Sequence, residues 1–205
     1  MRITTVLFDA DGVVQSAGRL ADYFAERYGW PAPRTADFFR HVFGERLDRD
    51  EVLSGTVEIL PAIQEALPRW GVTEPVETFV AGWLREGTVP DPDALELVAA
   101  LRRAGVVCGL ATNQDRLRAR YMEQDLGYRE LFDHRFYSSE LGVAKPDPAF
   151  FQAALAALAT PAAQVLFIDD NEPNVLAARG CGVHAELHLP GNSLRDLLAT
   201  YDLAV

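Results

Sequence analysis

The amino-acid sequence predicts an α/β protein with a doubly wound parallel sheet and an all-helical segment inserted after the first strand. Short apolar runs alternate with helical stretches along most of the chain, an order typical of parallel strands joined by helices. The apolar runs are nearly continuous, as expected of strands that are buried on both faces. One interval of about eighty residues has helical periodicity and no convincing strand, which predicts the insertion.

Four apolar runs are interpreted as the strands of the sheet. They cover residues 3–8, 106–111, 134–137 and 165–168. The spacing of apolar residues predicts helices over residues 93–104, 115–126, 148–158 and 173–180. Pro173 suits the start of the last helix, because the first helical N–H has no partner within the helix.

The interval after the first strand carries four groups of apolar residues at helical spacing. The groups cover residues 20–28, 38–43, 57–67 and 76–83. We therefore expect a helical cap of residues 15–89, inserted into a core of residues 1–14 and 90–205. The aromatic residues of this cap are expected to form its own core rather than to contact a substrate; they are Phe38, Phe39, Phe43 and Trp83.

The composition limits the partners of the chain. A formal net charge of −11 over 205 residues repels the phosphate backbone of nucleic acids. No apolar run reaches the length of a membrane span, and the N-terminus has no signal-cleavage pattern. Cys108 and Cys181 suit free thiols in a reducing compartment, and a disulfide between them is the alternative. We therefore expect a cytoplasmic monomer or homodimer with a small-molecule partner, without nucleic acid or membrane.

Each predicted strand runs into polar residues. In chain order these are Asp9 and Asp11, Thr112 and Asn113, Ser138 and Ser139 with Lys145 beyond them, and Asp169 and Asp170. The carboxyl ends of parallel strands lie at one edge of the sheet, where such folds bind their ligands. We therefore expect these side chains to converge on a single cleft.

The residue types at this edge indicate a phosphoryl-binding site. Four carboxylates cannot all be ionised together without a compensating cation. Mg²⁺ suits such oxygen ligands and commonly binds one or two carboxylates together with phosphate oxygens. Thr112 and Asn113 precede the predicted helix at residue 115, whose N-terminus is expected to attract an anion. Lys145 adds a compact positive charge to the same edge.

Lys145 is the only lysine of the chain, and the other cationic residues are arginines. An ammonium is a compact point charge, whereas a guanidinium is a broad planar fork. We infer that position 145 needs a small cation between a carboxylate and a phosphoryl oxygen. The arginines of residues 116–121 are expected to lie on a solvated helix face. His184 and His188 have a strand-like context that would place them about 13 Å apart, so we do not expect them to share a metal.

Four sequence motifs resemble those of the haloacid dehalogenase superfamily of hydrolases. They are FDADGVV (8–14), LATNQ (110–114), GVAKPDP (142–148) and VLFIDDNEPNVLAARGCG (165–182). All four occur in order at predicted strand ends, which makes the match specific. The resemblance covers residues 1–14 and 90–190, and it implies a Rossmann-like core with a small α-helical cap at 15–89. The chain looks most like members that dephosphorylate sugar phosphates and other small phosphometabolites.

The resemblance implies catalytic roles for three residues. Asp9 would attack phosphorus to form an aspartyl-phosphate, and its carboxylate would also bind Mg²⁺. Asp11 would protonate the leaving oxygen and then activate water, while its backbone carbonyl binds the metal. Because an acid must keep its proton near neutral pH, we expect a raised pKa for Asp11. Lys145 would bridge Asp9 and the phosphoryl group.

The resemblance also implies binding roles. The Thr112 hydroxyl and the backbone N–H of Asn113 would hold a phosphoryl oxygen. Asp170 would be a direct metal ligand, and Asp169 would either support it or bind the metal as an alternative ligand. A cap that closes over the cleft would exclude water and set specificity.

Three other functions stay open on the same fold. A dehalogenase would cleave a carbon–halogen bond, but that branch lacks the second aspartate of the first motif and needs no metal, so Asp11 and the Asp169–Asp170 pair argue against it. A mutase would transfer the phosphoryl group to a second hydroxyl instead of water. A non-enzymatic binding protein is the third, because a fold alone does not imply activity.

Overall fold

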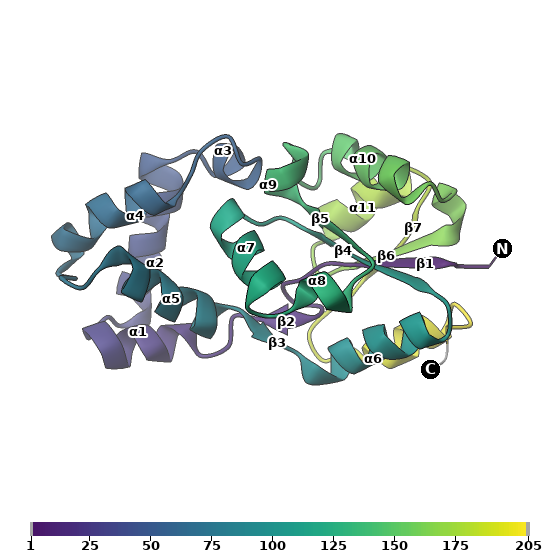
Figure 1. Ribbon diagram of the computed structural model, residues 1–205, viewed down its shortest axis with the longest axis horizontal. Coiled ribbons are helices and arrows are strands. Elements are labelled where there is room, and N and C mark those ends of the chain that lie inside the picture. The colour runs from purple at the N-terminus through teal and green to yellow at the C-terminus, as the bar shows by residue number, and fades with distance from the viewer. Residues whose placement is uncertain (1, 204–205) are drawn as a thin grey trace.

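The computed structural model describes residues 2–203 and contains one five-stranded parallel sheet (Figure 1). The strands lie in the order β5-β4-β1-β6-β7. Their bounds are β1 Thr5–Phe8, β4 Val107–Thr112, β5 His134–Tyr137, β6 Val165–Asp169 and β7 His184–Leu187. The chain starts in the middle of the sheet, adds strands on one side and then crosses to the other. This is a doubly wound α/β sheet, so the predicted fold class is confirmed.

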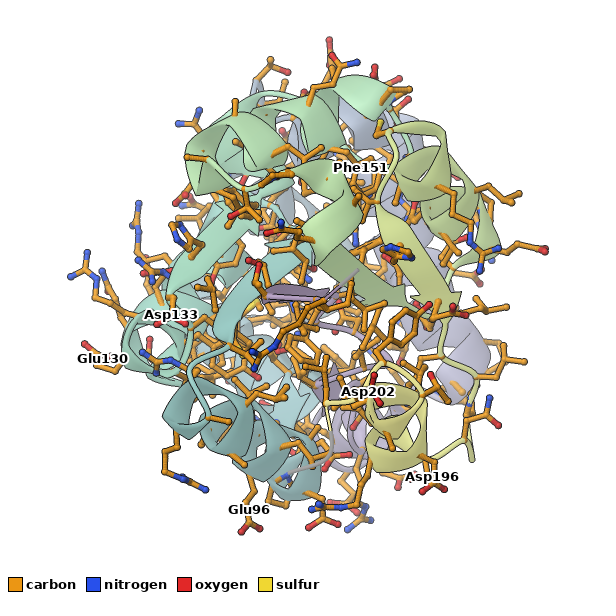
Figure 2. The ribbon with its side chains drawn as sticks, turned by 90° about the vertical axis from the view of Figure 1, so that its right-hand side faces the viewer. Glu96, Glu130, Asp133, Phe151, Asp196 and Asp202 are labelled. Carbon is orange, nitrogen blue, oxygen red and sulfur yellow. The ribbon has the colours of Figure 1, made fainter. Side chains whose placement is uncertain are left out.

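Helices cover both faces of this sheet, and an apolar cluster lies beneath each layer. One layer contains α6 (Pro92–Arg103), α7 (Arg116–Gln124), α8 (Tyr128–Leu131) and α12 (Leu194–Ala199); the other contains α10 (Pro148–Leu158) and α11 (Glu172–Gly180). Figure 2 views the sheet from the end away from α1–α5, where Phe151 lies inside and Glu96 and Asp196 point outward. Burial on both faces explains the near-continuous apolar strands.

The predicted strands and helices of the sheet domain agree with the structure to within two residues at each end. The sequence did not predict the short elements α8, α9 (Ser138–Leu141) and α12. Each of the first two has four residues, too few to show a helical period. The strand-like context of residues 184–188 corresponds to β7, which pairs with β6 at one edge of the sheet.

The insertion leaves and rejoins the sheet domain through two short paired strands. These strands, β2 (Gln15–Ser16) and β3 (Val89–Pro90), are antiparallel. Two residues give no sequence periodicity, so this ribbon was not predicted. We refer to β2, β3 and the adjoining residues Gly87 and Thr88 as the junction.

Five α-helices lie between the two junction strands, rather than the four predicted. They are α1 (Leu20–Tyr28), α2 (Ala32–Arg40), α3 (Arg49–Leu53), α4 (Leu60–Ala66) and α5 (Val76–Gly87). A π-helical segment, His41–Arg46, continues α2, and a 3₁₀ turn, Leu67–Trp70, continues α4. The extra helix α3 begins at an N-cap, because the Asp48 side chain accepts hydrogen bonds from the N–H groups of Asp50 and Glu51.

The inserted helices pack around an apolar cluster of their own, apart from the two clusters of the sheet domain. Phe24, Phe38 and Phe79 are completely buried in it. Helices α1 and α5 approach closely at Gly82, where a Cβ atom would lie 1.9 Å from the Tyr23 hydroxyl. This separate core supports the proposed cap of residues 15–89, which stays a prediction.

Two general expectations from the sequence can be compared with the structure. Cys108 and Cys181 are both free thiols, and Cys108 is buried in β4. Among residues 2–203, we find no helix with the length and apolar character needed to span a membrane.

Candidate active site

A buried lysine lies between two carboxylates at the carboxyl edge of the sheet. The Lys145 ammonium is 3.0 Å from Asp9 Oδ1 and 2.6 Å from Asp169 Oδ2. It also donates a hydrogen bond to the Ala111 carbonyl at 2.8 Å. Asp9 follows β1, Asp169 ends β6 and Ala111 lies in β4, three strands that are neighbours in the sheet. Residues far apart in sequence are thus brought to one point, as the strand-end pattern predicts.

These contacts give a physical reason for lysine at position 145. The ammonium has three donors, and the three oxygen atoms surround it from different strands. Its side chain is only 1% exposed, and the ring of Phe167 lies 5.0 Å from the nitrogen. A planar guanidinium would need a wider site and a different donor geometry.

Asn113 holds the loop that carries Lys145. Its side-chain amide donates to the Lys145 carbonyl at 2.7 Å, and its side-chain oxygen accepts from the Lys145 N–H at 2.9 Å. The sequence predicts that the side-chain amide and the backbone N–H of Asn113 both help to bind an anion, and the family resemblance implies the backbone N–H alone. The side chain therefore has a second task, which is to fasten the loop to the end of β4.

Asp9 is a nearly buried carboxyl whose environment opposes ionisation. Burial raises the pKa of Asp9 to about 6; Lys145 opposes this rise, and the negative charge of Asp169 adds to it. The residue is 8% exposed. A cation bound beside Asp9 would stabilise its ionised form and would oppose this rise in pKa.

Three carboxylates form a group that could hold a metal. Oxygen atoms of Asp9, Asp169 and Asp170 all lie within 4.8 Å of one another. Asp169 is completely buried and already bonded to other groups: Lys145, the N–H of Asn171 at 2.7 Å, and the Asn174 amide at 3.0 and 3.2 Å. Asp170 is exposed. The donor set fits a hard cation such as Mg²⁺, with Asp9 and Asp170 as the available carboxylates.

Gly12 allows the loop after β1 to approach the loop after β6. Its φ angle is +78°, and a Cβ atom there would lie 2.3 Å from Asp170 Oδ2. A residue with a side chain would be strained in this backbone conformation and would also displace the carboxylate. The glycine of the first motif therefore sets the position of the aspartate of the fourth.

Asp11 does not have the raised pKa that its predicted role as an acid requires. Burial favours a raised pKa, but the charge and hydrogen bonds of Arg118, with those of Gln15 and Gln114, outweigh burial and lower the pKa of Asp11. The Arg118 guanidinium binds both carboxylate oxygens at 2.7 Å. The prediction of a raised pKa for Asp11 was therefore wrong for this structure, because the sequence did not show that Arg118 would contact its carboxylate.

Arg118 also corrects the interpretation of residues 116–121 as a solvated arginine face. Its side chain is 18% exposed and points to Asp11, whereas Arg116 and Arg120 on the same helix are exposed. The Arg118 side chain reaches the end of the sheet from the first turn of α7. Sequence spacing alone does not show which of three nearby arginines faces the protein.

The N-terminus of α7 is not the open anion site that the sequence predicts. Asp115 is its N-cap, and its side chain accepts hydrogen bonds from the N–H groups of Leu117 and Arg118 at 2.9 and 3.0 Å. Aspartate at an N-cap satisfies the N–H groups that would otherwise attract an anion. Thr112 is buried beside Asp9 and accepts a hydrogen bond from the Gln114 amide at 3.2 Å.

The two serines that follow the third predicted strand are buried at the same edge of the sheet. The Ser138 hydroxyl accepts a hydrogen bond from the Gln114 N–H at 3.0 Å. Ser139 is buried, and its hydroxyl has no hydrogen-bond partner among the residues described. Both serines begin α9, a helix that the sequence did not predict.

A cavity of about 460 Å³ lies between the inserted helices and the strand ends. Its lining includes Asp11, Asn113 and Gln114 from the sheet domain, and Phe39, Arg40, Phe43, Arg49 and Trp83 from the insertion. The Phe39 and Trp83 rings are 5.3 Å apart. Only Phe38, of the four predicted core aromatics, is fully buried; the other three also face this cavity, so their assignment to the cap core alone was incomplete.

Four residues of the site were missed by sequence reasoning. Three of them, Gln15, Gln114 and Arg118, surround the Asp11 carboxylate. The fourth, Asn174, binds both oxygens of Asp169. Gln114 and Asn174 stand within the second and fourth motifs, which was a signal available in the sequence; Gln15 and Arg118 stand outside the motifs.

Comparisons with known proteins agree with this architecture. A phosphatase from Mycobacterium tuberculosis (strain CDC 1551 / Oshkosh) is 28% identical over 96% of this chain and 92% of its own length. A HAD family enzyme from Bacteroides thetaiotaomicron, in a crystal structure with magnesium and inorganic phosphate, has a TM-score of 0.76 at 22% identity, covering 95% of this chain and 98% of that one. An L-2-haloacid dehalogenase has a TM-score of 0.71 at 20% identity, over 98% of this chain and 100% of that chain.

The two solved structures show a shared fold alone, since both are less than 25% identical to this chain. The family is shown by a sequence model of haloacid dehalogenase-like hydrolases, which matches residues 3–182. This range includes all four motifs and every residue of the strand-end cluster. The chain therefore belongs to the haloacid dehalogenase-like hydrolases and is a hydrolytic enzyme.

Proposed function

We propose that this enzyme is a Mg²⁺-dependent phosphatase that hydrolyses a small phosphomonoester through an aspartyl-phosphate at Asp9. The observation that carries the proposal is the buried Asp9–Lys145 pair, with Asp169 and Asp170 beside it. A carboxylate nucleophile, a compact cation and free carboxylates for a metal are the parts that phosphoryl transfer needs. The similarity to a mycobacterial phosphatase over nearly the full length supports the same function.

Asp9 is the proposed nucleophile. Its carboxylate forms a bond to phosphorus, and the bond between phosphorus and the leaving oxygen breaks, which leaves an acyl phosphate on Asp9 and an alcohol. Water then attacks phosphorus, so inorganic phosphate leaves and the carboxylate is restored. Lys145 reduces the repulsion between the Asp9 carboxylate and the anionic phosphoryl group, because its ammonium already contacts Asp9 at 3.0 Å.

Mg²⁺ would be held by the carboxylates of Asp9 and Asp170 and by the backbone carbonyl of Asp11. When bound, it would neutralise phosphoryl charge and polarise the phosphoryl oxygen. Asp169 is proposed to support this site rather than to bind the metal, because Lys145, Asn171 and Asn174 already engage its oxygens. This assigns Asp169 the supporting role that the sequence left open.

Asp11 is the proposed proton carrier. In the arrangement described, Arg118 keeps it an ionised carboxylate, the form that accepts a proton from water in the second step. In the first step, the same carboxyl must deliver a proton to the leaving oxygen. Asp11 must therefore take up a proton, from solvent or from the monoanion of the phosphomonoester, and the hydrogen bonds around it must change before the first step.

The phosphoryl oxygens are proposed to bind the Thr112 hydroxyl and the backbone N–H of Asn113, at the end of β4 beside Asp9. The leaving group would occupy the cavity between this edge and the inserted helices. Its volume of about 460 Å³ suits a small metabolite such as a sugar phosphate. Phe39, Phe43 and Trp83 would contact the body of the substrate.

The direct test is phosphate release from 4-nitrophenyl phosphate with Mg²⁺ and with a chelator. Chelation is expected to lower the rate roughly 10²-fold or more, because a metal supplies several kcal/mol of charge stabilisation. Mg²⁺ should also raise the unfolding temperature, since it relieves repulsion among the carboxylates. This shift should be lost in Asp170→Asn and kept in Asp196→Asn, a matched exposed control on the far end of the molecule (Figure 2).

Two results would contradict the proposal. One is phosphate release that is equally fast with the chelator. The other is halide release from a 2-haloacid, without any release of phosphate from phosphomonoesters. The second result would assign the Asp9 nucleophile to the dehalogenase alternative.

A further inference from the structure

We propose that Arg118 is a positioning residue of this reaction, which anchors the Asp11 carboxylate and ties it to the junction between the inserted helices and the sheet domain. The inference rests on the proposed function, because it concerns the residue that would handle the proton. It assigns a task to an arginine outside the four motifs. Arg118 acts through Asp11 and is not itself placed at the reacting atoms.

Every N–H group of the Arg118 guanidinium has a partner. Two of them donate to the two oxygens of Asp11, both at 2.7 Å. The other three donate to the Gln114 side-chain oxygen at 3.1 Å, the Gly87 carbonyl at 2.8 Å and the Thr88 hydroxyl at 2.9 Å. A guanidinium has five donors in a rigid fork, so its position and that of Asp11 are fixed together.

The Asp11 carboxylate is also fully occupied. Besides the two bonds from Arg118, Oδ1 accepts from the Gln15 amide and Oδ2 from the Gln114 amide, each at 2.9 Å. A carboxylate offers about four lone-pair sites, and all are taken. The Asp11 side chain is still 43% exposed, so a leaving oxygen or a water molecule can approach it, but a hydrogen bond from Asp11 to either one competes with the four donors already present.

The neutral amides are the donors expected to withdraw. A bidentate arginine–carboxylate pair is charge-assisted and roughly twice as strong as a neutral hydrogen bond. When substrate or water takes a place on Asp11, a glutamine amide should yield while Arg118 stays. Arg118 is then the fixed partner that keeps the Asp11 carboxylate oriented during proton transfer.

The remaining bonds of Arg118 connect this anchor to the junction. Gly87 is the last residue of α5, and Thr88 is buried between it and β3. Gln15, which also binds Asp11, lies in β2 and pairs with β3. Two of the three residues that hold Asp11, Arg118 and Gln15, therefore contact or belong to the junction through which the insertion leaves and rejoins the sheet domain. A shift of the inserted helices reaches Asp11 through these contacts.

The test compares two substrates of similar shape that differ in their need for a proton. The 4-nitrophenolate anion is a weak base and leaves without a proton, whereas the strongly basic 4-nitrobenzyl alkoxide must receive a proton on its oxygen and leave as the alcohol. In Arg118→Met, kcat/KM for 4-nitrobenzyl phosphate should fall roughly 10²-fold, the scale of a misplaced catalytic group. The value for 4-nitrophenyl phosphate should fall less than about tenfold, since kcat/KM reports the step in which the leaving group departs.

Three further variants separate positioning from charge and from folding. Arg118→Lys keeps the charge but not the fork, so it should resemble Arg118→Met. Thr88→Val removes one of the two contacts of Arg118 with the junction and leaves the bond to the Gly87 carbonyl. It should lower the 4-nitrobenzyl to 4-nitrophenyl ratio about threefold, in the same direction, because it loosens the anchor. Arg120→Met, an exposed change on the same helix, should alter neither value. Thermal unfolding of each variant checks that the fold is retained.

Equal losses for the two substrates in Arg118→Met would overturn the inference, as would wild-type selectivity in Arg118→Lys. An unchanged ratio in Thr88→Val would overturn the part of the inference that connects Asp11 to the junction through Thr88. If the wild type hydrolyses both esters in an Asp9-dependent manner and the Arg118 variants keep its selectivity, the inference fails while the proposed function stands. If the wild type hydrolyses neither ester, both fail.

Discussion

Replacing Lys145 by methionine is expected to abolish phosphate release and to destabilise the protein. The ammonium contacts Asp9, Asp169 and the Ala111 carbonyl, and its side chain is 1% exposed. Its removal leaves two buried carboxylates beside each other without a cation. Breaking a buried ion pair in this way typically costs about 3–5 kcal/mol. We also expect a loss of roughly 10³-fold or more in kcat, because the phosphoryl group loses a preorganised charge.

The Lys145→Arg variant separates the positive charge of residue 145 from its compact shape. It keeps the positive charge, but a planar fork does not fit three oxygens that surround one nitrogen. We expect most of the stability loss and most of the activity loss to remain. Urea unfolding and steady-state rates measure both. A Lys145→Arg enzyme within about tenfold of the wild-type kcat, an interval of about 1.4 kcal/mol, would show that charge alone suffices and that the compact shape of lysine is irrelevant.

Asp9→Asn is expected to lower activity and to raise stability. Without its carboxylate, residue 9 cannot form the acyl phosphate, and loss of a nucleophile costs roughly 10⁴-fold or more in rate. In the metal-free protein, however, Asp9 ionises against its surroundings, since its pKa is raised from 3.8 to about 6. Each pKa unit corresponds to about 1.4 kcal/mol, so the variant should gain about 1–3 kcal/mol at pH 7.5.

The extra stability of Asp9→Asn over the wild type should depend on pH. A group with a raised pKa in the folded state favours folding while it is protonated, and the advantage is lost as pH rises through the folded pKa of about 6. The stability difference between Asp9→Asn and the wild type should therefore vanish below about pH 4 and be complete above about pH 6. Urea unfolding with a chelator across this range measures it. A variant no more stable than the wild type at pH 7.5 would show that burial does not oppose the ionisation of Asp9.

The sequence was sufficient for the sheet and for the convergence of its strand ends. Strands that are buried on both faces have a nearly continuous apolar pattern, which a single sequence is enough to show. Parallel pairing then brings Asp9, Thr112 and Asp169 to one edge of the sheet, whatever the details of side-chain packing. The lone lysine among arginines was a further signal. Its two carboxylate partners, Asp9 and Asp169, were expected beside it because all three residues follow strands at the same edge of the sheet.

The surroundings of Asp11 could not be predicted, because they depend on tertiary packing. Arg118 belongs to a run of arginines with similar spacing, and only the orientation of α7 selects which one points inward. Gln15 reaches Asp11 from a strand of two residues, which has no periodicity to detect. Asp115 illustrates a different limit. The apolar spacing of α7 predicts that a helix begins near residue 115, but it does not show whether the Asp115 side chain caps the first N–H groups or leaves them open to an anion.

The most direct test of Asp9 as the nucleophile is to trap the aspartyl-phosphate intermediate. Wild-type enzyme is quenched during turnover of 4-nitrophenyl phosphate and reduced with borohydride, which converts an acyl phosphate to an alcohol. Trypsin cleavage after Arg2 and Arg19 yields the peptide of residues 3–19, which contains both Asp9 and Asp11. Fragmentation in a mass spectrometer then locates the change. We expect homoserine at position 9 and an unmodified Asp11. Phosphate release with reduction at another carboxylate, or with none, would contradict the assignment of Asp9 as the nucleophile.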